Sequence, residues 1–435
     1  MSPSLLGLIG IVALLGLLAM RIPVAFAMFL VGIVGVSLLN GIGPAISLLA
    51  SESFTLASNQ DLVVVPLFIL MGNIATQSGM SRSLYAAAYA WIGQIRGGLA
   101  SATVVGCAGF AALSGSSIAT ALTIGSVSLK EMARFNYDRR LATGVVAAGG
   151  TLGILIPPST GFVVYAILTQ ESIGRLFLAG VLPGLLLTAL FILAITVICW
   201  MRPQYGPAGE RIPLREKMRS LAGALPITSI IIITIGGIYV GLFSPIEASA
   251  VGAALAILFG FIGRSLTLRG LVAAFRDSVG TTATVMLILI AAHILNPFIA
   301  LTHIPTAVGT FLTALDVGPY GILFLIVLVY LVLGCFLEGL SMLVLTMPVF
   351  YPIILSLGFD PIWYGVIVVI VLEMAMISPP VGVNAFIVKS VARDVPLRDI
   401  FIGILPFWAM MIVAVIVLTI FPQIALILPN TMIGN

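Results

Sequence analysis

Two short segments of this sequence place small polar residues in the middle of long apolar runs. The first reads Leu113-Ser-Gly-Ser-Ser117, and the second reads Glu338-Gly-Leu-Ser341. Serine and glycine weaken a helix, and polar groups in apolar surroundings are expensive to keep unless another group satisfies them. Their hydroxyl, carboxylate and freed carbonyl oxygens are suitable ligands for a small cation or a polar solute. We call these segments the first tip (residues 113–117) and the second tip (residues 338–341).

Each tip is followed along the chain by an apolar run that contains a pair of prolines. These pairs are Pro157-Pro158 and Pro379-Pro380. Proline has no backbone N–H group and cannot continue a helix, so the carbonyl groups before each pair lose their usual donors. Such a break persists in an apolar environment only where the freed carbonyl oxygens face protein, water or an ion. A cluster of carbonyl and hydroxyl oxygens suits a bare cation, and sodium is the natural candidate.

We predict that each tip meets the proline break that follows it, and that each meeting point forms a sodium site. The first site comprises Ser114, Gly115, Ser116, Thr151, Gly153 and Pro157, and the second comprises Gly339, Ser341, Ser378, Pro379 and Gly382. The substrate is expected between the tips, near Ser117, Ser159, Glu338 and Asn384. The alternative interpretation is that serine and glycine only permit tight helix packing and that proline only kinks a helix. Because two broken spans are each paired with a polar tip, we favour the interpretation that these residues form binding sites.

Two acidic residues are predicted to lie inside the apolar part of the molecule. Glu338 belongs to the second tip, and an ionisable group inside a membrane is a functional candidate. It could bind a cation or carry a proton. Glu373 is similar, although it could instead extend to the membrane interface or pair locally.

The composition excludes an ordinary soluble globule. Hydrophobic residues make up 61% of the 435 residues and charged residues only 8%, which is far more apolar side chain than a soluble core requires. Apolar stretches long enough to cross a bilayer recur throughout, for example at 5–20, 24–39, 176–201 and 400–422. We therefore predict an all-α polytopic membrane protein that lies in a lipid bilayer. The net charge of +4 comes from basic residues in short loops, so it indicates orientation in the membrane and no nucleic-acid partner.

The positive residues also predict the topology in a bacterial inner membrane. With the N-terminus outside, the Lys and Arg residues collect on the cytoplasmic side, and only Arg175 lies opposite. This arrangement places both termini in the periplasm. It requires two segments, at about 99–129 and 319–357, to enter and leave on the same side as re-entrant hairpins. Plain crossings remain the alternative, because hydropathy does not separate a hairpin from two short helices.

An internal repeat divides the chain into two halves. An offset of about 222 to 224 positions aligns Gly115 with Gly339, Asp138 with Asp360, and the two proline pairs with each other. We predict a first repeat at 1–201 with a broken helix at about 141–168, a cytoplasmic linker at 202–221, a second repeat at 222–421 with a broken helix at about 361–388, and a periplasmic tail at 422–435. Five crossings and one hairpin in each repeat invert the second repeat and imply alternating access. Chance matching of Gly-rich and Pro-rich apolar sequence is the alternative.

Motifs for catalysis are absent from the sequence. None of the three lysines follows a glycine, as a phosphate-binding P-loop requires, and the patterns HExxH and GxSxG do not occur. We therefore expect no enzymatic activity. Energy for any transport would come from ion gradients, because each net charge moved inward contributes about 2.3 kcal/mol per 100 mV.

Taken together, six segments resemble the large membrane subunit of tripartite ATP-independent periplasmic (TRAP) transporters. They are the first tip, Gly153-Ile-Leu-Ile-Pro-Pro-Ser159, Ala179-Gly-Val-Leu-Pro-Gly184, Leu337-Glu-Gly339, Thr346-Met-Pro348 and Ser378-Pro-Pro-Val-Gly-Val-Asn384. The resemblance covers essentially the whole chain. It implies sodium-coupled uptake, or symport, of an organic acid and an elevator-type movement of a hairpin-bearing transport domain against a scaffold domain. It also implies that the tips and the broken spans hold sodium and substrate.

The same resemblance implies two protein partners, a small four-helix membrane subunit on a separate chain and a periplasmic substrate-binding protein. A single-component sodium/dicarboxylate carrier of the same ion transporter superfamily is the closest alternative. A membrane-embedded enzyme and a passive channel are alternatives from other classes. C4-dicarboxylates, sialic acid and other small organic acids all remain open as substrates, because in a binding-protein system the partner largely sets selectivity.

Overall fold

The computed structural model describes residues 2–334 and 337–432 as an all-helical chain. The helices of the first half are α1 (Pro3–Ala19), α2 (Val24–Asn40), α3 (Ile42–Ala57), α4 (Val64–Gln77), α5 (Met80–Ile92), α6 (Gly98–Ser114), α7 (Ser117–Arg134), α8 (Arg139–Leu155), α9 (Thr160–Thr169) and α10 (Ile173–Met201). Those of the second half are α11 (Leu214–Tyr239), α12 (Pro245–Ile262), α13 (Leu268–Leu301), α14 (Ile304–Ala314), α15 (Gly318–Leu333), α16 (Gly339–Ser356), α17 (Pro361–Met376), α18 (Val383–Val391), α19 (Leu397–Ile420) and α20 (Gln423–Asn430). The predicted all-α class is confirmed.

Seven helical segments in the described part of the chain are long and apolar enough to cross a membrane. They are residues 60–77, ending in α4, and the helices α10, α11, α12, α13, α16 and α19. The pair α8 and α9, bent by 40°, would make an eighth span. Further apolar helices, including α1, α2 and α15, have only 16 or 17 residues. The chain is therefore a polytopic membrane protein, while the ten full crossings remain a prediction.

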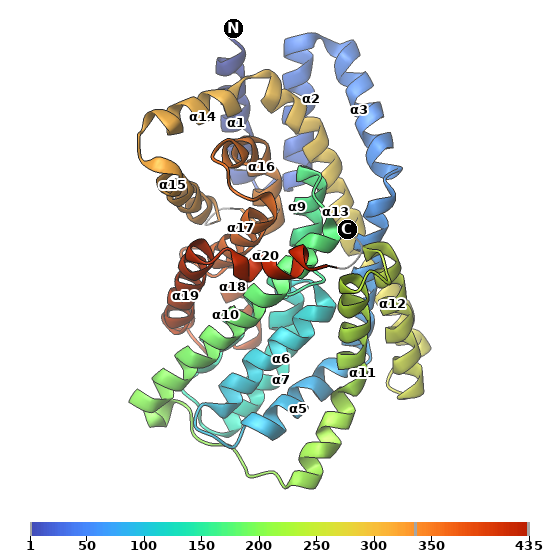
Figure 1. Ribbon diagram of the computed structural model, residues 1–435, viewed down its shortest axis with the longest axis vertical. Coiled ribbons are helices and arrows are strands. Elements are labelled where there is room, and N and C mark those ends of the chain that lie inside the picture. Colours follow the sequence, from blue (N-terminus) through green and yellow to red (C-terminus); the bar gives the residue numbers. More distant parts are fainter. Residues whose placement is uncertain (1, 335–336, 433–435) are drawn as a thin grey trace.

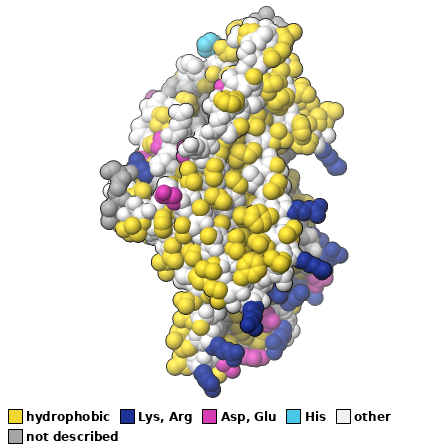
Figure 2. All heavy atoms as spheres, turned by 90° about the vertical axis from the view of Figure 1, so that its right-hand side faces the viewer, with side chains coloured by type: hydrophobic (Ala, Val, Ile, Leu, Met, Phe, Trp, Pro, Cys, Tyr) yellow, Lys and Arg dark blue, Asp and Glu magenta, His cyan; other side chains and the backbone are white. Residues whose placement is uncertain are grey.

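The surface agrees with a membrane environment. Figure 2 shows hydrophobic side chains over most of the face to which α11 and α12 contribute, with Lys and Arg gathered toward the lower end and one edge. Large apolar side chains such as Leu225, Ile232 and Leu258 are more than half exposed on these two helices. A soluble protein rarely exposes a continuous apolar face of this kind, whereas acyl chains cover it in a bilayer.

Two helices, α8 and α17, form the centre of the molecule. All residues from Leu141 to Leu155 of α8 and from Ile362 to Met376 of α17 are buried. Helices α6, α7 and α19 pack against α8, and α15, α16 and α10 pack against α17. Figure 1 shows α2 and α13 side by side at one end of the molecule, and α11 beside α12. The two helices that lead into the proline pairs are therefore surrounded by other helices of the protein.

Each of the two central helices begins with an aspartate N-cap. Asp138 Oδ1 accepts hydrogen bonds from the N–H groups of Arg140 and Leu141, at 2.9 and 3.1 Å. Asp360 does the same for the N–H groups two and three residues further along, at 2.8 and 3.0 Å. An aspartate at this position satisfies donors that a helix start leaves unpaired. The aspartates that the repeat aligns thus share a role, although the repeat itself stays a prediction.

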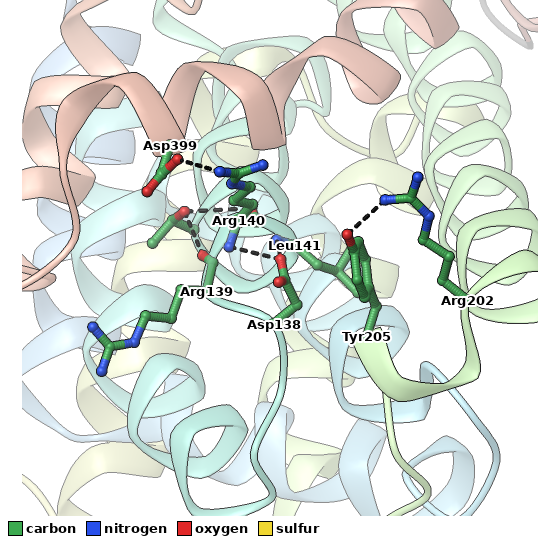
Figure 3. Close-up of polar contacts among 8 residues, drawn as sticks. Asp138, Arg139, Arg140, Leu141, Arg202, Tyr205 and Asp399 are labelled. Atoms are coloured by element: carbon green, nitrogen blue, oxygen red, sulfur yellow. Dashed lines mark hydrogen bonds and ion pairs between the residues drawn. The ribbon is translucent and has the colours of Figure 1, made fainter.

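An ion pair ties the start of α8 to the start of α19. The guanidinium of Arg140 lies 2.9 Å from the carboxylate of Asp399, and the neighbouring Arg202 donates to the Tyr205 hydroxyl at 2.6 Å (Figure 3). The two helices are also very close, because a Cβ atom added at Gly144 would lie 2.1 Å from the carbonyl oxygen of Gly403. Glycine on both helices permits this approach.

Candidate functional site

Within the first tip, Gly115 and Ser116 form a two-residue break between α6 and α7. Gly115 ends α6 with φ of 57°, a left-handed conformation that suits glycine. Ser116 begins α7 by accepting a hydrogen bond from the N–H of Ala119 at 3.3 Å. The hydroxyls of Ser114 and Thr120 lie 2.9 Å apart. The serine and glycine residues therefore end one helix and begin the next, as their low helix propensity predicts.

The first tip contacts the break between α8 and α9. The Thr160 hydroxyl, at the start of α9, donates to the carbonyl oxygen of Gly115 at 2.9 Å. On the other side of the break, a Cβ atom added at Gly153 would lie 2.5 Å from the carbonyl oxygen of Ser116. The structure thus brings together Gly115, Ser116 and Gly153 of the predicted first sodium site.

Two other residues near the first break, Thr151 and Ser159, have hydrogen bonds within their own segment. The Thr151 hydroxyl is buried and donates to the Ala148 carbonyl at 2.5 Å. Ser159 caps α9 by accepting from the N–H of Phe162 at 3.3 Å, and it also donates to the carbonyl of Ile154. Pro157 begins the proline pair, whose peptide bond is cis, as is that of Pro379-Pro380.

The residues predicted for the second sodium site fall into two groups. Ser378 donates to the Met374 carbonyl at 2.7 Å and accepts from the indole N–H of Trp408 at 2.8 Å. Together with Pro379 it lines a hollow of about 320 Å³ between α15 and α19. Gly382, with φ of 55°, begins α18 close to the ring of Phe401.

The other group belongs to the second tip. Glu338 caps α16, and its Oε2 accepts from the backbone N–H and the hydroxyl of Ser341 at 3.3 and 3.2 Å. A Cβ atom added at Gly339 would lie 3.1 Å from the sulfur of Met376, at the end of α17. The second tip therefore meets the end of the broken helix, while Ser378 and Pro379 face α19.

A cavity of about 450 Å³ lies between the two tips. Ser114, Ser116 and Ser117 line it from the first tip, and Glu338 lines it from the second. Helices α4 and α13 complete its walls, and Met376 contributes from α17. Of the residues predicted for the substrate, Ser117 and Glu338 are in this lining, whereas Ser159 lines a neighbouring narrow gap. A volume of this size suits a small molecule.

Sequence reasoning missed the polar side chains that α4, α9 and α13 supply to the cavity. They are Asn73, Thr76, Thr160, Thr281 and Thr284. The amide nitrogen of Asn73 donates to the hydroxyl of Ser278 at 2.8 Å, which joins α4 to α13. Pairs of polar residues three apart on apolar helices would have been the available signal, since such residues share a helix face.

A buried carboxyl group, that of Glu373, contacts the cavity-lining residue Ser117. The Ser117 hydroxyl donates to Glu373 Oε1 at 2.6 Å, and Glu373 is only 1% exposed. Asn384, predicted for the substrate, is fully buried, and within the described part of the chain neither atom of its amide has a hydrogen-bond partner. Glu373 therefore does not extend to the membrane interface, and its partner comes from the other half of the sequence.

Comparison with known proteins identifies the family. Residues 11–424 match the model of the DctM component of tripartite ATP-independent periplasmic transporters. The chain belongs to this DctM family. The C4-dicarboxylate TRAP transporter large permease protein of Pseudomonas aeruginosa is 38% identical over 88% of this chain and 89% of its own length. The sialic acid TRAP transporter large permease protein of Vibrio cholerae is 32% identical over 97% of each chain.

A solved structure shares the fold of this DctM-family chain. The YdaH transporter of Alcanivorax borkumensis superposes with a TM-score of 0.62 over 90% of this chain and 88% of its own, at 15% identity. The predicted resemblance to the large TRAP subunit is confirmed. The DctM-family relatives are named as transporter permeases rather than enzymes, and the family name describes a tripartite system.

Proposed function

We propose that the chain is the large permease subunit of a TRAP transporter that takes up a small organic acid together with sodium across the bacterial inner membrane. The observation that carries this proposal is the cavity of about 450 Å³ between the two tips, lined by hydroxyl groups and Glu338. A small four-helix membrane subunit and a periplasmic binding protein complete the system in this proposal, since the family is tripartite.

Sodium would bind where the first tip meets the first break. The Thr160 hydroxyl bonds the Gly115 carbonyl here, and the carbonyl of Ser116 lies against Gly153 of α8. Oxygen atoms from a helix end and from side-chain hydroxyls are typical ligands for sodium at broken membrane helices. For the second site, Ser378 is the strongest member, because its hydroxyl lies directly before the second proline pair and bonds the Met374 carbonyl at 2.7 Å.

The substrate would be a carboxylate, bound mainly by neutral donors. Two of the relatives are named for C4-dicarboxylates and sialic acid, and both of these solutes carry carboxylates. Among the described residues that line the cavity there is no Lys, Arg or His, whereas Asn73, Thr281 and Ser117 can donate hydrogen bonds. Bound sodium would then supply the positive charge that a carboxylate needs, which explains why the two solutes are coupled.

The transport cycle would follow the elevator scheme. In this proposal the repeats at 1–201 and 222–421 are inverted, and the tips move with the central helices α8 and α17 as a transport domain. The long helix α13 and the helices α2, α4, α11 and α12, which pack against one another, would form the scaffold. The cavity lies between the tips and α4 and α13, where such a movement would carry it across the membrane.

Uptake into proteoliposomes tests the proposal. The chain and its small partner subunit are reconstituted, and the cognate binding protein with succinate or sialic acid is added outside, with or without an inward sodium gradient. We expect accumulation that requires both sodium and the binding protein. Sodium-driven uptake without the binding protein would instead identify a single-component carrier, and an unsaturable flux independent of sodium would indicate a channel.

Two variants connect the function to the site. Ser116→Ala and Ser378→Ala are expected to weaken the sodium dependence of uptake, because each removes a hydroxyl beside a helix break. Ser390→Ala is the matched control for Ser378→Ala, since its hydroxyl also donates to a carbonyl of its own helix but is exposed and distant from the tips in sequence. Unchanged sodium dependence in both site variants would reject the site assignment.

A further inference from the structure

The carboxyl group of Glu373 lies where a charge is hard to accommodate. The side chain is 1% exposed and belongs to α17, whose neighbouring residues are buried and apolar. Its Oε1 accepts the hydroxyl of Ser117 at 2.6 Å. Its Oε2 is buried and has no hydrogen-bond partner among the described residues. An ionised carboxylate in such surroundings requires a compensating charge, and otherwise it takes up a proton.

Among the described residues, no basic side chain on the elements packed against α17 bonds Glu373. Arg139 of α8 pairs with Asp394, and Arg398 of α19 is exposed. Lys389 of α18 donates to the carbonyls of Arg393 and Val395, and Arg140 of α8 pairs with Asp399 of α19. Arg175, in the first turn of α10, donates to Asn430 of α20. Glu338, which lines the cavity at the start of α16, adds a second acid on this side of the molecule. Without a bound cation, a proton is therefore what neutralises the negative charge of the Glu373 carboxylate.

Ser117 connects this carboxyl group to the cavity. Its hydroxyl donates to Glu373, while the same residue lines the cavity between the tips. Met376, one turn after Glu373 on α17, lines the cavity as well. A cation in the cavity would thus lie on the other side of Ser117 from the carboxyl group. Its positive charge would favour the ionised form of Glu373 over the protonated form.

We propose that Glu373 is a proton-binding site, coupled through Ser117 to the cavity, and that sodium entering the cavity displaces its proton. This inference rests on the sodium-coupled function proposed above. Without sodium, the proton is bound to Oε2, and Oε1 accepts from Ser117. When sodium binds, the O–H bond at Oε2 breaks, the proton leaves to the water of the cavity, and the carboxylate remains, separated from the cation by Ser117. Because linkage is reciprocal, protons oppose sodium binding to the same extent.

Proton release on addition of sodium is the direct test. The purified chain in lipid nanodiscs is placed in a weakly buffered solution with a pH indicator, and sodium chloride or choline chloride is added. We expect sodium, and not choline, to release protons from the unmodified chain and from Glu216→Gln, whose exposed carboxyl group lies at the start of α11. In Glu373→Gln this release is lost. The amide keeps the size of the side chain and remains neutral.

Sodium binding is measured on the same samples by thermal stabilisation at several pH values. In the unmodified chain, sodium affinity should increase with pH by up to about tenfold per unit, as competition with one proton requires. In Glu373→Gln it should be independent of pH. Sodium binding without proton release, or unchanged release from Glu373→Gln, would overturn this inference and leave the proposed transport function intact. If the chain bound no sodium at any pH, both proposals would fail.

A second variant serves if Glu373→Gln does not fold. Ser117→Ala keeps the carboxyl group but removes the hydrogen bond to Oε1. The infrared carbonyl band of the protonated acid should then shift relative to the unmodified chain, because its oxygen loses a donor. A band that is identical in both proteins, or absent from the unmodified chain without sodium, would contradict the assignment.

Discussion

The hydroxyl of Thr160 donates a hydrogen bond of 2.9 Å to the carbonyl oxygen of Gly115. One residue begins the helix after the first proline break, and the other forms the turn of the first tip. Gly115 adopts a left-handed backbone, and its carbonyl is directed across the break rather than along α6. The carbonyl at the end of α6 would otherwise lack a donor. The hydrogen bond from Thr160 supplies one and joins the end of α6 to the start of α9.

Replacing Thr160 by valine tests this connection. The substitution keeps the shape of the side chain but removes the donor to Gly115, and losing a partner of a buried acceptor costs about 1–3 kcal/mol. We expect a lower unfolding temperature in detergent and sodium binding weaker by about tenfold, which corresponds to about 1.4 kcal/mol. Thr196→Val is the control, because that hydroxyl bonds the carbonyl of Ile192 on an exposed face of α10. Equal effects of the two substitutions would argue against a special role for the tip.

How much of this site the sequence could predict depends on the range of the interactions. Serine, glycine and proline act on their own neighbours, so the tips and the breaks were predictable from residue type. The contact between the first tip and the first break follows from their closeness along the chain. By contrast, Asn73 bonds Ser278 and Ser117 bonds Glu373, pairs that are 205 and 256 positions apart. Only the packing of α4 on α13 and of α7 against the central helices creates these contacts.

Gly153 is expected to tolerate no side chain. An added Cβ atom would lie 2.5 Å from the carbonyl oxygen of Ser116, which is backbone and cannot rotate away. In Gly153→Ala the first tip must therefore move from α8, at a cost of about 1–3 kcal/mol in stability. We expect sodium-dependent uptake to be lost or strongly reduced while the protein still inserts into the membrane.

The matched control for Gly153 is Gly236→Ala on α11. No atom lies within 4 Å of the Cβ position at that glycine, so alanine should fit there. Because alanine is also the better helix former, this variant should be at least as stable as the unmodified chain. If Gly153→Ala retained full uptake and sodium affinity, close contact between the tip and α8 would not be required for function.

The pair Arg140 and Asp399 is expected to stabilise the contact between α8 and α19 only modestly. Their side chains are 50% and 30% exposed, and pairs of this kind contribute about 0.2–1 kcal/mol. Asp399→Asn should therefore lower the unfolding temperature slightly, and Arg140→Asp combined with Asp399→Arg should recover part of the loss (Figure 3). A double-mutant cycle for Arg139 and Asp394, which are about 70% exposed, should give a smaller coupling energy. A larger coupling in the exposed pair would contradict this ranking.

The predicted orientation places the loop between α12 and α13 in the cytoplasm and the helix α3 toward the periplasm. Ser265 lies in that loop beside Arg264, and Ser51 lies on α3 beside Glu52; both serines are exposed. In a chain whose three native cysteines are replaced by alanine, Ser51→Cys should react with a membrane-impermeant maleimide in intact cells. Ser265→Cys should react only after the membrane is permeabilised, because basic loops stay on the cytoplasmic side. The reverse pattern of labelling would invert the topology and would place the binding protein on the face now assigned to the basic loops.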